Sequence, residues 1–110
     1  MDLKDRVALV TGASTGIGEA IALGYAAAGA HVVLAARNIT RLKMVASRIT
    51  DVGGSCEVAR LDVSEYSTIG PVIDRVVERH GHLDILCNNA GVSTAPGNVI
   101  DVSAEQIIIS

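Results

Sequence analysis

The chain has 110 residues, which fits one domain, and 49% of them are hydrophobic while 19% are charged. This composition excludes intrinsic disorder and suits a parallel sheet, whose strands are buried on both faces. A net charge of −3 and the absence of Trp and Phe argue against nucleic-acid binding, which uses basic surfaces and aromatic stacking platforms.

No targeting or membrane segment is predicted. Residues 2–6 are mostly charged and lead into only a short apolar run, unlike a signal peptide. Residues 20–36 are apolar, but Gly24, Gly29 and His31 interrupt them, and the stretch is shorter than the ~20 residues that cross a bilayer. We therefore expect a cytoplasmic protein without a membrane partner.

The two cysteines, Cys56 and Cys87, each lie in an apolar run. Buried, reduced thiols are the expected state of such residues. Neither has further cysteine or histidine partners at ligand spacing, so we predict neither a disulfide nor a metal site.

Four short apolar runs predict strands at residues 6–11, 31–36, 56–61 and 83–88. Apolar residues at helical spacing predict three helices between them, which end near Gly29, Gly53 and Gly81. Pro71 is placed in the first turn of the third helix, where a missing N–H costs little. Strictly alternating strands and helices indicate an α/β fold with a parallel sheet.

The segment after the fourth strand gives a weaker pattern. Ser103 followed three residues later by Gln106 resembles a capping box, which predicts the start of another helix. The fourth strand is then expected to be an exposed edge of the sheet, which would make the isolated chain only marginally stable and prone to self-association.

The strongest motif is the turn from Thr11 to Gly18, with sequence TGASTGIG, between the first strand and the first helix. Gly12 permits a tight turn, Gly16 lets the backbone approach a pyrophosphate, and Gly18 allows the helix to pack closely on the strand. The helix N-terminus would add exposed amides and a positive dipole. A glycine-rich turn without a ligand is the alternative, although its position between strand and helix favours phosphate binding.

This glycine spacing, together with Asn88-Asn89-Ala90-Gly91 and Asp62-Val63, resembles the short-chain dehydrogenases/reductases. The resemblance extends from about Leu3 to the end of the chain. It implies a Rossmann-type doubly wound parallel sheet, truncated here to four strands in the order 3-2-1-4 with flanking helices. Residues 1–110 would form one incomplete NAD(P)-binding domain of an oxidoreductase that transfers hydride between a nicotinamide cofactor and an alcohol or carbonyl substrate.

The resemblance also implies a set of cofactor-binding residues. The glycine turn would line the pyrophosphate and adenosine ribose, and Asp62 and Val63 would contact the adenine. The segment 89–91 would lie beside the nicotinamide-side ribose, with Asn88 bracing the sheet, although an Asn-Asn-Ala-Gly strand end can also be a simple turn. The full set is Gly12, Ser14, Thr15, Gly16, Ile17, Gly18, Arg37, Asn38, Asp62, Val63, Asn89, Ala90 and Gly91.

The residue that closes the second strand discriminates between the two nicotinamide cofactors. An acidic side chain there would hydrogen-bond the ribose 2′-hydroxyl of NAD. Ala36 stands at this position and is followed by Arg37 and Asn38, and a guanidinium can pair with the 2′-phosphate of NADP. We expect NADP, with NAD as the alternative, because Thr15 replaces a second basic residue of the family and Arg37 could be a solvated surface residue.

No catalytic residue is predicted in this chain. The family's catalytic Tyr precedes a Lys by four residues, whereas Tyr25 and Tyr66 are followed at that distance by Gly29 and Gly70. His80 and His82 are expected to be solvated rather than catalytic or metal-binding. The chain alone is expected to be inactive, with a stand-alone nucleotide-binding module or a non-functional fragment as alternatives. The parent enzyme would form a homo-oligomer, and its substrate is not determined by these residues.

Overall fold

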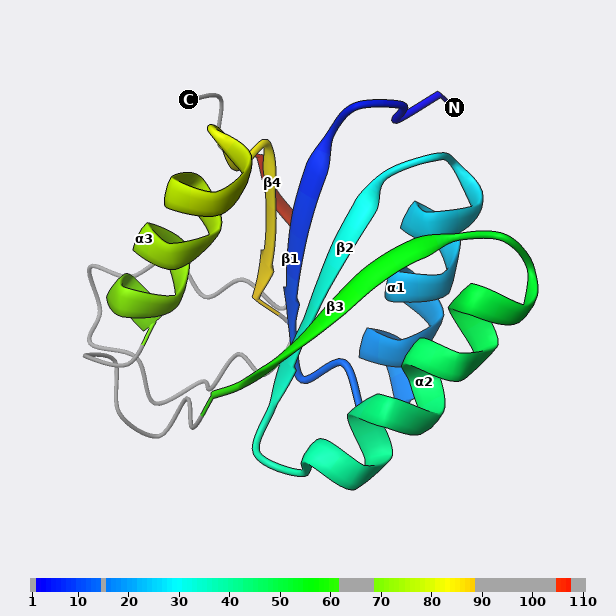
Figure 1. The fold of residues 1–110 in the computed structure, drawn as a ribbon. Helices are drawn as coiled ribbons and strands as arrows, with labels where there is room; N and C mark the ends of the chain where they lie inside the picture. Colours follow the sequence, from blue (N-terminus) through cyan, green and yellow to red (C-terminus); the bar gives the residue numbers. More distant parts are fainter. Residues whose placement is uncertain (1, 15, 62–68, 89–104, 108–110) are drawn as a thin grey trace.

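The structure, a computed structural model, describes residues 2–14, 16–61, 69–88 and 105–107. Within these residues the strands form one sheet in the order β3-β2-β1-β4-β5 (Figure 1). The four parallel strands confirm the predicted order 3-2-1-4. The strands are β1 (Val7–Thr11), β2 (His31–Ala36), β3 (Ser55–Arg60), β4 (Ile85–Asn88) and β5 (Glu105–Ile107).

Helices cover both faces of this sheet. In Figure 1 α1 and α2 lie together on one side, and α3 lies on the other. Their bounds are Gly16–Ala27 for α1, Ile39–Asp51 for α2 and Ile69–His80 for α3. Pro71 therefore falls in the first turn of α3, as predicted.

The alternation of side chains along the buried strands divides the core into two clusters. Val10 and Leu34 pack in the cluster beneath α1 and α2, which includes Leu42 of α2. Leu9 and Val33, each one residue earlier, pack in the cluster beneath α3. Every residue of β1 is buried, which explains why its first four residues are all apolar and do not alternate with polar residues.

The predicted helix stops are also confirmed. Gly29, Gly53 and Gly81 each follow a helix and adopt positive φ angles of 103°, 85° and 87°. At Gly29 a Cβ would also lie 3.2 Å from the backbone nitrogen of Lys4, so a side chain would be crowded there in addition to being strained by the positive φ.

The expected helix near Gln106 is wrong. Residues 105–107 form β5, which pairs antiparallel with β4 through Ile85↔Ile107 and Leu86↔Gln106. The local capping pattern is outweighed because β4 offers unpaired backbone groups and the sequence after Gln106 is rich in β-branched isoleucine. Consequently β4 is not the exposed edge that the sequence predicted, and Ser103 lies outside the described residues.

The two cysteines differ in their surroundings. Cys87 is buried, as predicted, whereas Cys56 is half-buried and its thiol contacts the carbonyl oxygen of Ala46 at 3.7 Å. None of the described helices is both long enough and apolar enough to span a bilayer.

Candidate functional site

The candidate site lies at the carboxyl edge of the parallel strands, where β1 ends and α1 begins. The connecting turn has positive φ angles at Gly12 (64°) and Gly16 (55°). The backbone N–H of Ala13 donates to the carbonyl oxygen of Ala35 at 3.3 Å, which ties the turn to β2. The turn is therefore held against the sheet while the first turn of α1 presents its N–H groups at this edge.

The described residues of the glycine motif lie together at the start of α1. Gly18 is buried against the sheet side of α1, Ser14 is half-buried and Gly16 is exposed. A Cβ at Gly16 would meet no atom within 4 Å, so the space beside its backbone is open. Ile17 places a large apolar side chain in solvent, with 69% of its surface exposed. Thr15 lies outside the described residues.

The end of β2 carries the residues expected to choose the cofactor. Ala36 is half-buried and Arg37, which follows it, is exposed. Asn38 has a further structural role, because it is the N-cap of α2 and its side-chain oxygen accepts from the backbone N–H of Arg41 at 3.1 Å. A carboxylate is absent from this described strand end, and an exposed guanidinium is present.

Arg41 is a residue at this edge that the sequence analysis missed. Its Nε donates to the carbonyl oxygen of Ser14 at 3.5 Å and thereby connects the first turn of α2 to the glycine turn. The sequence could have indicated Arg41 through Asn38, a residue type that favours helix N-caps. A helix that begins after Asn38 has Arg41 in its first turn, beside the end of β2.

Several predicted cofactor-binding residues lie outside the described part of the chain. These are Asp62 and Val63, which follow β3 in sequence, and Asn89, Ala90 and Gly91, which follow β4. Asn88 ends β4 and pairs in register with Thr11 of β1. The strands that lead to these segments thus end at the same edge of the sheet as the glycine turn.

The expectation that His80 and His82 are solvated is wrong. His80 Nε2 lies 2.6 Å from Glu57 Oε1, and His82 Nδ1 lies 2.5 Å from Asp84 Oδ2. Their side chains are only 24% and 35% exposed. The pairing of His80 was not visible in the sequence because its carboxylate partner belongs to a different element, β3.

Sequence comparisons identify known proteins that are similar to this chain. The family model described as short chain dehydrogenase matches residues 6–109. An 11-beta-hydroxysteroid dehydrogenase A of Sesamum indicum is 46% identical over 92 residues, covering 83% of this chain and 26% of that protein. A fatty acyl-CoA reductase of Acinetobacter baylyi is 41% identical, covering 84% of this chain and 31% of that protein.

Solved structures give the same result. A metagenomic short-chain oxidoreductase in complex with NADP has a TM-score of 0.78 and 44% identity, covering 82% of this chain and 41% of that one. A hydroxysteroid dehydrogenase from Escherichia coli has a TM-score of 0.74 and 33% identity, covering 79% and 37%. The chain thus spans less than half the length of each of these relatives. It belongs to the short chain dehydrogenase family of oxidoreductases.

Proposed function

We propose that this chain is the NADP(H)-binding N-terminal part of a short-chain oxidoreductase. The whole enzyme would transfer hydride between the nicotinamide cofactor and an alcohol or carbonyl substrate. The observation that carries the proposal is the turn between β1 and α1, with left-handed glycines at positions 12 and 16 and open space beside Gly16. This arrangement suits a pyrophosphate, whose negative charge is stabilised by the amides and dipole of a helix N-terminus.

The proposed preference for NADP(H) follows from the end of β2. Arg37 is exposed beside Ala36, so its guanidinium is available to pair with a 2′-phosphate, and no carboxylate at Ala36 would repel that group. Arg41 adds a second guanidinium at this edge through its contact with Ser14. The NADP complex of a relative at 44% identity supports a nicotinamide dinucleotide as the ligand.

The remaining assignments rest on the family resemblance. Asp62 and Val63 would contact the adenine, and residues 89–91 would lie beside the nicotinamide-side ribose. No Tyr-x-x-x-Lys occurs in the 110 residues, so we propose that this chain binds cofactor but does not catalyse hydride transfer alone. Residues 1–110 would be one incomplete domain of a cytoplasmic enzyme that assembles as a homo-oligomer.

Matched glycine substitutions test the nucleotide site. Gly16 and Gly53 both have positive φ angles, and a Cβ at either would meet nothing within 4 Å. Gly16→Ala and Gly53→Ala should therefore cost a similar amount of stability, roughly 1–2 kcal/mol, through backbone strain. Only Gly16→Ala should weaken NADPH binding, by about tenfold to a hundredfold, because a methyl group would occupy the close approach of the pyrophosphate.

Calorimetric titration with NADPH, combined with thermal unfolding, separates these two effects. The unmodified protein and Gly53→Ala should bind NADPH with the same affinity. Equal affinity in Gly16→Ala, or no saturable binding by the unmodified protein, would contradict the proposed function.

A further inference from the structure

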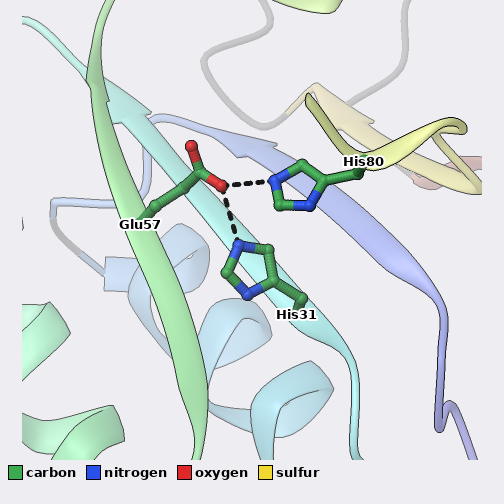
Figure 2. A group of neighbouring side chains, drawn as sticks. All are labelled: His31, Glu57 and His80. Atoms are coloured by element: carbon green, nitrogen blue, oxygen red, sulfur yellow. Dashed lines mark hydrogen bonds and ion pairs between the residues drawn. The ribbon is translucent and has the colours of Figure 1, made fainter. Parts of the chain in front are cut away.

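A cluster of three metal-ligating side chains lies away from the nucleotide site. His31 comes from the start of β2, Glu57 from β3 and His80 from the end of α3 (Figure 2). His31 is opposite Val7 at the start of β1, whereas the glycine turn follows the end of that strand. The cluster therefore occupies the end of the sheet opposite the glycine turn.

The donor atoms of this cluster converge on one point. Nε2 of His31 and Nε2 of His80 lie 2.8 Å and 2.6 Å from the same atom, Oε1 of Glu57. All three ligand atoms lie within 4.8 Å of one another. Figure 2 shows the two rings directed at this carboxylate, and their centroids are 4.7 Å apart.

The cluster is neither fully buried nor freely solvated. The three side chains are 21–25% exposed, so an ion could enter from solvent without unfolding the chain. Each ligand comes from a different element of secondary structure, which limits how far the donor atoms can separate. Such positioning by rigid elements favours a defined site over a surface cluster of mobile side chains.

Neighbouring polar groups orient two of the three ligands. Ser55 Oγ lies 2.5 Å from Nδ1 of His31, which leaves Nε2 of that ring directed at the cluster. Arg79 donates to Oε2 of Glu57 at 3.0 Å, so Oε1 is the oxygen left facing the histidines. Outer contacts of this kind fix the orientation of metal-bound imidazoles and carboxylates.

We propose that His31, Glu57 and His80 bind a divalent transition-metal ion of the zinc type, with water completing the coordination. Two imidazole nitrogens and one carboxylate oxygen match the ligand types of Zn²⁺, whereas Mg²⁺ and Ca²⁺ take oxygen ligands. His80 was not expected to bind a metal from the sequence, because His31 and Glu57 come close to it only through the fold.

Binding requires the donor atoms to rearrange, because Oε1 of Glu57 lies 2.8 Å and 2.6 Å from the two ring nitrogens and the three atoms lie within 4.8 Å of one another. For comparison, the ligands of a tetrahedral ion at metal–ligand distances of ~2.0–2.1 Å lie roughly 3.3 Å apart. The ion would replace the direct contacts of Glu57 Oε1 with the two rings. It would then connect α3 to β2 and β3 and stabilise the folded chain, because the site does not exist in the unfolded state.

The experiment is a titration of the untagged, chelator-treated protein with Zn²⁺ by calorimetry, and with Co²⁺ by visible absorption. We expect saturable binding of a single ion per chain and a higher unfolding temperature with Zn²⁺.

Two substitutions test the proposed ligands, and a third is the control. His80→Gln and Glu57→Gln should abolish both the cobalt spectrum and the stabilisation by zinc. His82→Gln is the matched control, since His82 is also half-exposed and paired with a carboxylate, that of Asp84. It should bind Zn²⁺ like the unmodified protein.

Two results would overturn the proposal: no saturable binding by the unmodified protein, or equal binding by His80→Gln and His82→Gln. If Glu57→Gln fails to fold, His80→Gln decides the question. The side chain of His80 lies at the end of α3, and its removal leaves Glu57 paired with His31 and Arg79. Nucleotide binding plays no part in this readout, so the result is independent of the proposed function.

Discussion

The backbone N–H of Val7 donates to Oδ2 of Asp84 at 2.8 Å, which joins the first residue of β1 to the segment that leads into β4. The same carboxylate contacts Arg6 at 3.5 Å and His82 at 2.5 Å. Asp84 is buried, with 9% of its surface exposed, so the contact between the two segments does not depend on a solvated ion pair. Asp84 is therefore part of the framework that holds the sheet together.

Removal of this carboxylate should destabilise the fold. We expect Asp84→Ala to lower the free energy of unfolding by about 1–3 kcal/mol, because it leaves the buried N–H of Val7 without its acceptor. Arg6→Ala should cost less than about 1 kcal/mol, since the Arg6 side chain is 58% exposed. Urea unfolding of both variants checks the difference, and equal losses would show that the ion pair with Arg6 is the stabilising contact.

Asp84 should also contribute to acid sensitivity. Burial raises the pKa of this carboxyl, but the hydrogen bonds from Val7 and His82 and the charges of His82 and Arg6 hold it below its ordinary value. A lowered folded-state pKa gives stability that is complete above the unfolded value of about 3.9 and is lost as the pH falls through the folded value.

The corresponding measurement is the free energy of unfolding from about pH 6 to about pH 3. It should fall more steeply in the unmodified protein than in Asp84→Asn, in which this group no longer titrates. Parallel pH profiles for the two proteins would exclude a contribution from Asp84.

Two alanine substitutions at glycines should act in opposite directions. A Cβ at Gly54 would lie 2.7 Å from Cγ2 of Ile49 and 3.1 Å from its carbonyl oxygen, so Gly54→Ala should cost about 1–3 kcal/mol. A Cβ at Gly24, within α1, would meet nothing within 4 Å. Gly24→Ala should stabilise the chain by roughly 0.5–1 kcal/mol through helix propensity. Thermal unfolding distinguishes them, and a stabilised Gly54→Ala variant would show that the described packing around Ile49 is wrong.

The chain alone should not oxidise NADPH in the presence of aldehydes or ketones. Neither Tyr25 nor Tyr66 has a Lys four residues later, so the family's positioned proton donor is missing from this sequence. Such a donor is typically worth about 10²–10⁴-fold in rate. The check is NADPH absorbance over time with a panel of carbonyl compounds and the purified 110-residue protein. Carbonyl-dependent oxidation above the protein-free rate would show that another group donates the proton.

The features that could be predicted from the sequence are those encoded locally. The helix stops at Gly29, Gly53 and Gly81 follow from a residue type that accepts positive φ, and the glycine turn follows from its position between a strand and a helix. The strand at Glu105–Ile107 could not be predicted, because its conformation is determined by pairing with β4 and not by its own capping pattern.

The contacts that the sequence did not reveal join residues far apart in the chain. Glu57 meets His31 and His80 only because β2, β3 and α3 pack together, and these residues are separated by 26 and 23 positions. Arg41 reaches Ser14 across 27 positions in the same way. Spacing patterns detect neighbours on one helix or strand, so contacts between elements need the three-dimensional arrangement.

The central claim, that the end of β2 recognises the 2′-phosphate of NADP(H), is tested most directly by titrating the protein separately with NADPH and NADH. We predict that NADPH binds about tenfold to a hundredfold more tightly, as expected for a charge-assisted contact of roughly 1.5–3 kcal/mol with Arg37. Ala36→Asp should reverse this preference, because a carboxylate repels the 2′-phosphate and accepts from the 2′-hydroxyl. Equal affinities for the two cofactors in the unmodified protein would contradict the account.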